Sequence, residues 1–182
     1  MTLDCTPPPL DVQAFAEAAT LRSGCDTLSN YERLMQETQG LGGDRPLDWA
    51  AQGELRTDAV GASQAWLHLT VAAKLPLTCQ RCLGPADIAV SVDRWFRFVA
   101  TEAVAEALDD DAEEDLLVTS RQFNLAELIE DELLLGLPLV PRHDQCPAGL
   151  TMSVADPGFE AELSDKPHPF AALARLRAGG PG

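Results

Sequence analysis

The stretch Trp66–Val71 (WLHLTV) decides the fold, because an aliphatic residue occupies every second position. Successive side chains of a β-strand point to opposite faces, so this alternation predicts a strand with one buried face. The same period recurs before it in Leu47–Leu55 and after it in Ile88–Phe98. Strands and helices do not alternate along this part of the chain as a parallel sheet requires. We therefore expect an α+β fold: an antiparallel sheet, open or barrel-like, with a few helices packed on it.

Helices are expected on either side of the strands. The clearest begins at Asn124, whose side chain can cap a helix, with Glu127 at the capping-box position. Its apolar residues follow the helical period: Leu125, Leu128, Ile129 and Leu133. Shorter helices are expected over Asp11–Ala19 and Asn30–Thr38, and a last one around Phe170. We expect one domain over residues 1–178, followed by a disordered tail over 179–182.

The charge of the chain is strongly negative. It has 13 Lys and Arg against 29 Asp and Glu, a net charge of −16. Such a surface repels phosphate backbones and favours association with basic proteins. Residues 102–115 contain eight acids and no base, which predicts a solvated, flexible acidic loop over about residues 100–118.

The cysteines indicate a candidate metal site. Cys79 and Cys82 have the two-residue gap that lets both thiolates reach one ion, and His143 and Cys146 would complete a tetrahedral Cys₃His set for zinc. This requires the fold to join two distant segments, and the alternative is that the thiols are reduced and metal-free. A thioredoxin-like role would need a helix after the pair, which Leu83–Pro85 (LGP) does not permit.

The location of the protein is indicated by what the sequence lacks. No signal peptide or membrane-spanning stretch is recognisable, and five cysteines make a disulfide framework improbable. We therefore expect a protein of the cytoplasm with no membrane partner.

Three segments of the chain carry a family resemblance: Leu75–Leu83 (LPLTCQRCL), Asp131–Pro141 (DELLLGLPLVP) followed by HDQC at 143–146, and Lys166–Leu173 (KPHPFAAL). Together they resemble the YceD family, the large ribosomal RNA subunit accumulation proteins. The resemblance runs in consistent order over about residues 10–177. Many members have further cysteines after the Leu-Pro segment, where this chain has Cys146. The resemblance implies a non-enzymatic accessory factor for large-subunit biogenesis, supporting synthesis, processing or stability of 23S-type ribosomal RNA, and it supplies no catalytic residues.

Charge and resemblance together predict a basic ribosomal or assembly protein as the partner, with any effect on ribosomal RNA indirect. The candidate docking residues are Glu127, Glu130 and Asp131 on the polar side of the helix, and Arg81 in the cysteine turn. One rival is a direct RNA-binding module, for which the mid-chain bases are Arg81, Arg94, Arg97 and Arg142. The other rival is a thiol or metal-dependent enzyme. The sequence does not identify the partner, the assembly step or the oligomeric state.

Overall fold

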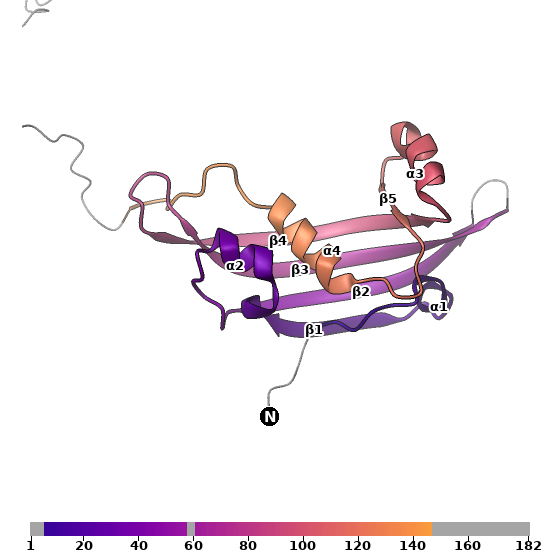
Figure 1. Ribbon diagram of the computed structural model, residues 1–182, viewed down its shortest axis with the longest axis horizontal. Helices are drawn as coiled ribbons and strands as arrows, with labels where there is room; N and C mark the ends of the chain where they lie inside the picture. The colour runs from indigo at the N-terminus through magenta and orange to yellow at the C-terminus, as the bar shows by residue number, and fades with distance from the viewer. Residues whose placement is uncertain (1–5, 58–60, 147–182) are drawn as a thin grey trace, which may run out of the picture. The chain divides into compact units, whose positions relative to one another are not determined.

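The computed structural model describes residues 6–57 and 61–146, which contain one five-stranded sheet (Figure 1). The strands are β1 (Leu21–Thr27), β2 (Pro46–Thr57), β3 (Ser63–Thr78), β4 (Pro85–Val99) and β5 (Asp115–Val118). The chain divides into two compact units, residues 1–146 and 147–182. The second unit lies outside the described residues, and so do the expected helix around Phe170, the tail over 179–182 and the predicted domain end at 178.

The sheet follows the chain from edge to edge in the order β1-β2-β3-β4-β5. The first four strands pair antiparallel, as the alternation predicted, and β5 adds to β4 in the parallel sense. Within the described residues the sheet is open and does not close into a barrel. The expected α+β class is confirmed.

One face of the sheet carries the core. Alternate residues of the three long strands are buried on it: Leu47, Trp49 and Ala51 of β2, Leu67, Leu69 and Val71 of β3, and Val90, Val92, Phe96 and Phe98 of β4.

The opposite face is bridged by a stack of side chains, in which the Arg56 guanidinium lies 4.3 Å from the ring centre of Trp66 and 3.9 Å from that of Trp95. His68 stacks on Trp95 with 4.4 Å between ring centres. These cation–π and stacking contacts tie three strands together where no second layer covers them among the described residues.

Helices α1 (Val12–Glu17), α2 (Glu32–Glu37) and α4 (Leu125–Leu135) supply apolar residues to the core on that inner face, and a 3₁₀ turn, η1 (Leu28–Asn30), precedes α2. Figure 1 shows α2 and α4 lying across the strands. The predicted cap of α4 is confirmed, since the Asn124 side chain accepts from the Glu127 backbone N–H at 3.2 Å. The apolar stripe is confirmed as well, because Leu125, Ile129 and Leu133 are fully buried.

The acidic segment over 100–118 differs from the predicted loop. It contains α3 (Glu102–Leu108), a 3₁₀ turn η2 (Asp109–Asp111) and strand β5. Thr101 caps α3 by accepting from the Val104 N–H. Two of the acids are neutralised by bases of β4, because Arg97 pairs with Glu114 and Arg94 with Asp115. Counting acids along the sequence missed these partners, because they are distant in the chain.

Gly53 marks a close approach between β2 and α1. A Cβ at this position would lie 2.6 Å from the Phe15 carbonyl oxygen, which belongs to a fixed helix backbone. We expect Gly53→Ala to lower the free energy of unfolding by about 1–3 kcal/mol, as overpacking does. Gly43→Ala is the matched control, since its Cβ would meet nothing closer than 3.4 Å. Urea denaturation of both variants checks this, and equal midpoints would contradict it.

Candidate metal centre

The turn between β3 and β4 holds the first two cysteines. The Cys79 N–H donates to the Gly84 carbonyl at 2.9 Å, and the Leu83 N–H donates back to the Cys79 carbonyl at 2.8 Å. Leu83 takes a left-handed conformation with φ of +60° to close this turn. Cys79 is fully buried and Cys82 is partly buried. The turn thus keeps both thiols at one end of the sheet.

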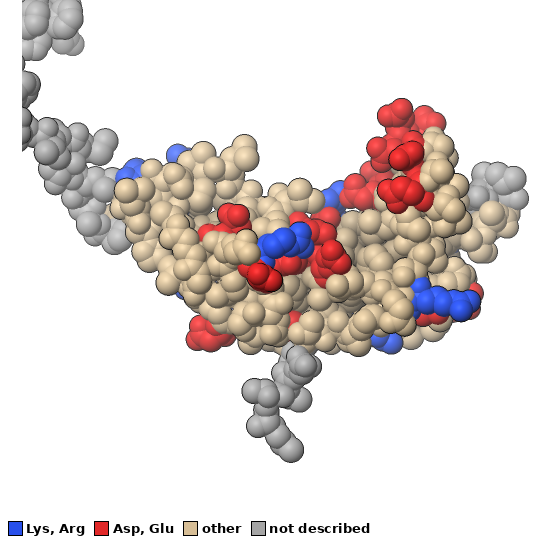
Figure 2. Space-filling model, in the orientation of Figure 1, with Lys and Arg blue, Asp and Glu red and all other residues tan. Residues whose placement is uncertain are grey.

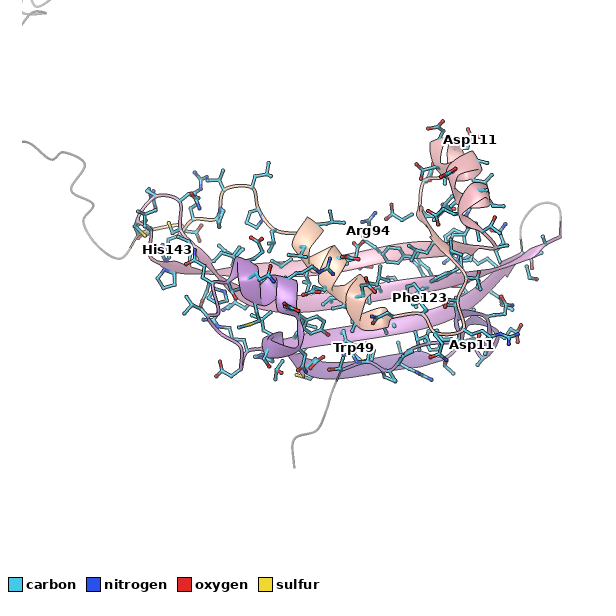
Figure 3. All side chains as sticks on the ribbon, in the orientation of Figure 1. Asp11, Trp49, Arg94, Asp111, Phe123 and His143 are labelled. Carbon is cyan, nitrogen blue, oxygen red and sulfur yellow. The ribbon has the colours of Figure 1, made fainter. Side chains whose placement is uncertain are left out.

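The chain segment after α4 brings the other two residues to this turn. The Gln80 N–H donates to the Pro141 carbonyl at 2.8 Å, which holds the segment against the turn. Figure 3 labels His143 at the same end of the sheet, beside sulfur atoms. One ligand atom from each of Cys79, Cys82, His143 and Cys146 lies within 4.8 Å of the other three. The four residues that sequence spacing singled out are therefore brought together; we call them the Cys₃His group.

The spacing of the donor atoms fits a tetrahedral zinc ion. Zinc bonds of about 2.3 Å to sulfur and about 2.0–2.1 Å to nitrogen place two sulfurs about 3.8 Å apart, and a sulfur and a nitrogen about 3.5 Å apart. The Cys79 and Cys146 sulfurs are 3.9 Å apart. The Cys82 sulfur is 3.4 Å from Nδ1 of His143. The group can hold a metal without rearrangement of these pairs.

The outer contacts of the group prepare it for a cation. Nε2 of His143 lies 2.9 Å from the Pro85 carbonyl oxygen. A carbonyl only accepts, so Nε2 carries the proton and Nδ1 keeps its lone pair for a metal. Arg81 donates from Nε to the Cys146 sulfur at 3.1 Å and from a terminal nitrogen to the His143 carbonyl at 3.1 Å. Three thiolates around a divalent ion leave one negative charge, which Arg81 offsets.

The thiols differ in acidity. Burial is the largest influence on Cys79 and opposes ionisation, but hydrogen bonds from the backbone of His143, Cys82 and Arg81 outweigh it and lower its pKa to about 5. A backbone hydrogen bond from Gly84 lowers the pKa of Cys82, but burial and the neighbouring cysteines together leave that pKa raised. Within this crowded group one thiolate forms readily and opposes a second.

Two of the three predicted docking residues of α4 are bonded within the chain. Glu130 was expected to face solvent, and this is wrong, because its side chain is 12% exposed and bonds to α2 and Arg33. Asp131 pairs with Arg33 at 2.5 Å. Glu127 is exposed, as expected. Helical periodicity assigns a side to each residue but does not show which second helix lies there, and so it missed Arg33, 97 residues earlier.

The bases proposed for the RNA-binding rival are mostly engaged within the chain. Arg94 bonds to Glu132 and Asp115, Arg97 bonds to Glu114, and Arg81 bonds to the Cys₃His group. Arg142 is exposed. On the face shown in Figure 2, Lys and Arg atoms are scattered and form no continuous patch. The structure gives the RNA-binding rival no concentrated positive surface on this face.

Comparison with known proteins identifies the family. The family model described as large ribosomal RNA subunit accumulation protein YceD matches residues 67–177, more than half of the chain. The chain belongs to the YceD family. The match includes all four residues of the Cys₃His group.

A curated YceD relative supports the same assignment. The large ribosomal RNA subunit accumulation protein YceD of Haemophilus influenzae (strain ATCC 51907 / DSM 11121 / KW20 / Rd) is 34% identical over 103 residues, which cover 56% of this chain. The matched part of the chain spans 59% of the length of that relative. No solved structure matches the chain.

Proposed function

We propose that this protein is a non-enzymatic accessory factor for accumulation of the large ribosomal RNA subunit, supporting the synthesis, processing or stability of 23S-type RNA in the cytoplasm. The observation that carries the proposal is the family match over residues 67–177, since the family is named for that process. The description of the curated relative agrees with it. None of the helices in the described part of the chain combines the length and apolar character needed to cross a bilayer.

The partner in this proposal is a basic ribosomal or assembly protein. A net charge of −16 attracts cationic proteins over a long range and repels free RNA. The exposed Glu127 contributes to this attraction. Docking through Asp131 or Arg81 would require these side chains to give up the contacts that they make within the chain.

The Cys₃His group binds one zinc ion in this proposal. The support is the donor chemistry, the tetrahedral spacing and the proton position on His143. The ion would join the β3–β4 turn to the segment that follows α4. Structural zinc sites with four protein ligands leave no open position for a substrate, so the role of the ion would be to hold the fold and not to catalyse a reaction.

Loss of the gene should lower mature large-subunit RNA relative to small-subunit RNA. The reason is that loss of an accessory factor for the large subunit reduces large-subunit RNA and leaves small-subunit RNA unaffected. The measurement is the ratio of the two mature RNAs in a deletion strain at normal and low temperature, with the wild-type gene restored as control. An unchanged ratio at both temperatures would show that the process has been wrongly assigned.

A further inference from the structure

A groove of about 580 Å³ lies between α3 and the neighbouring ends of β3 and β4. Arg121 is the one charged residue in its lining. The other lining residues are apolar or uncharged: Gln13, Ser63, Gln64, Ala65, Phe98, Val99, Ala100, Val104, Leu108, Thr119 and Ser120. We call this the α3 groove. It lies away from the Cys₃His group, which sits at the other end of β3 and β4, and it shares no residue with that group.

Helix α3 is poorly covered by the other residues that the structure describes. It has seven residues, and none of them is buried. Val104 is 39% exposed and Leu108 is half-buried, and both line the groove. A helix this short is marginal without tertiary packing of an apolar face. Within residues 6–57 and 61–146, the apolar side of α3 is therefore left partly exposed.

The solvent-exposed side of α3 is acidic. Glu102 and Glu106 of α3 and the following Asp109–Asp111 are all exposed, and within the described residues none of them forms an ion pair. Figure 2 shows these acids as the densest red region on that face, over α3. In contrast, the acids of α4 are neutralised, because Glu130 and Asp131 pair with Arg33, and Glu132 pairs with Arg94. Uncompensated acidic charge of the described surface is thus densest on α3, the helix that borders the groove, and on the turn η2 that follows it.

We propose that the α3 groove is the docking surface for a basic polypeptide segment that places apolar side chains against Val104 and Leu108 and its Lys or Arg side chains against the acids of α3 and η2. This inference rests on the proposed function, which supplies a basic protein as partner, and it replaces α4 with α3 as the surface that receives it. Charge complementarity selects protein over nucleic acid, because the same carboxylates repel phosphate.

The test uses the full-length protein and, as probe, the total protein of purified large ribosomal subunits from which the RNA has been removed. Bound proteins are identified by mass spectrometry, and the dissociation constant of the most tightly bound one is then measured with it purified. The triple variant Glu102→Gln, Glu106→Gln, Asp110→Asn should weaken binding by about tenfold or more at 0.1 M salt, because neutralising clustered charge removes the attraction. The matched control Glu32→Gln, Asp44→Asn, Asp48→Asn removes three exposed acids elsewhere and should change binding by less than about threefold.

A second pair of variants tests the apolar part without a change of charge. Val104→Ser with Leu108→Ser should weaken binding by about tenfold, the loss expected when apolar anchors are removed from an interface. Leu21→Ser with Leu41→Ser, which alters exposed leucines elsewhere, should leave binding unchanged. Unaltered melting temperatures keep the comparison independent of folding, and since α3 buries no residue, we expect them.

The outcomes separate the two proposals. If a large-subunit protein binds the wild type and both α3 variants equally, the α3 groove is not the docking surface, while the proposed function stands. If no large-subunit protein binds and the purified chain instead retards naked large-subunit RNA, the basic-protein partner of the proposed function is wrong. Weakened binding in both α3 variants, with both controls unchanged, supports the groove.

Discussion

Replacement of Cys82 by serine should abolish zinc binding and lower the melting temperature by about 10 °C or more. Binding of structural zinc to small domains is worth about 10–16 kcal/mol near pH 7, and this free energy contributes to folding. Even a loss of about 3 kcal/mol would shift the midpoint of a chain of this size by about 10 °C. The wild type should contain about one zinc per chain, which metal analysis of purified protein measures directly.

Cys25→Ser is the matched control for this prediction. Cys25 lies in β1 and takes no part in the Cys₃His group. Its replacement should leave both zinc content and melting temperature unchanged. A chelator should lower the melting temperature of the wild type and of Cys25→Ser but not of Cys82→Ser. Wild-type protein that is purified without metal, and that melts at the same temperature with and without chelator, would show that the thiols serve no metal.

The sheet and the proximity of the four residues of the Cys₃His group were the features best predicted from sequence, for different physical reasons. The alternation of apolar residues in Trp66–Val71 matches the alternating burial of β3, because one face of β3 is buried against the helices. The cysteine pair and His143 were recognisable because a metal demands particular donor types at short spacing. The sequence did not show how the second segment reaches the turn, because the contact between Gln80 and Pro141 is made by backbone atoms, which any residues could supply.

The charged residues were predicted least well. Arg94 is a charged residue at a position of β4 whose neighbours in the alternation, Val92 and Phe96, face the core. Its side chain joins the buried Glu132 of α4 to Asp115 of β5. Its partners are 21 and 38 residues away, beyond the reach of local patterns. The same limitation produced the wrong exposure for Glu130 and the predicted loop where β5 lies. Charge along a sequence gives a total, whereas its effect depends on which opposite charges the fold brings close.

Among the charged residues whose contacts the sequence did not predict, we expect Glu130 to have the largest effect on stability. Helix α2 begins at Glu32, and its N-cap, Tyr31, provides no side-chain hydrogen bond to the first turn. The carboxylate of Glu130 takes that place from another helix, since its Oε1 accepts from the backbone N–H groups of Arg33 at 2.7 Å and Leu34 at 3.2 Å. Its Oε2 accepts from Nε of Arg33 at 2.9 Å. One side chain therefore caps α2, fixes α2 to α4 and neutralises Arg33.

Glu130→Ala should therefore lower the free energy of unfolding by about 3–5 kcal/mol, because it removes three hydrogen bonds to one charged carboxylate, and such bonds are worth about 1.5–3 kcal/mol each. Glu130→Gln should cost less, about 1–3 kcal/mol, because the amide oxygen can still accept from the two backbone N–H groups while the charge is lost. Glu127→Ala, one turn earlier on the exposed side of α4, is the control and should cost about 0.5 kcal/mol or less. Urea denaturation gives the three values, and hydrogen exchange of the Arg33 and Leu34 amides reports the cap directly. If Glu130→Ala is as stable as Glu127→Ala and these amides remain protected, the carboxylate does not cap α2, and Glu130 is available for docking after all.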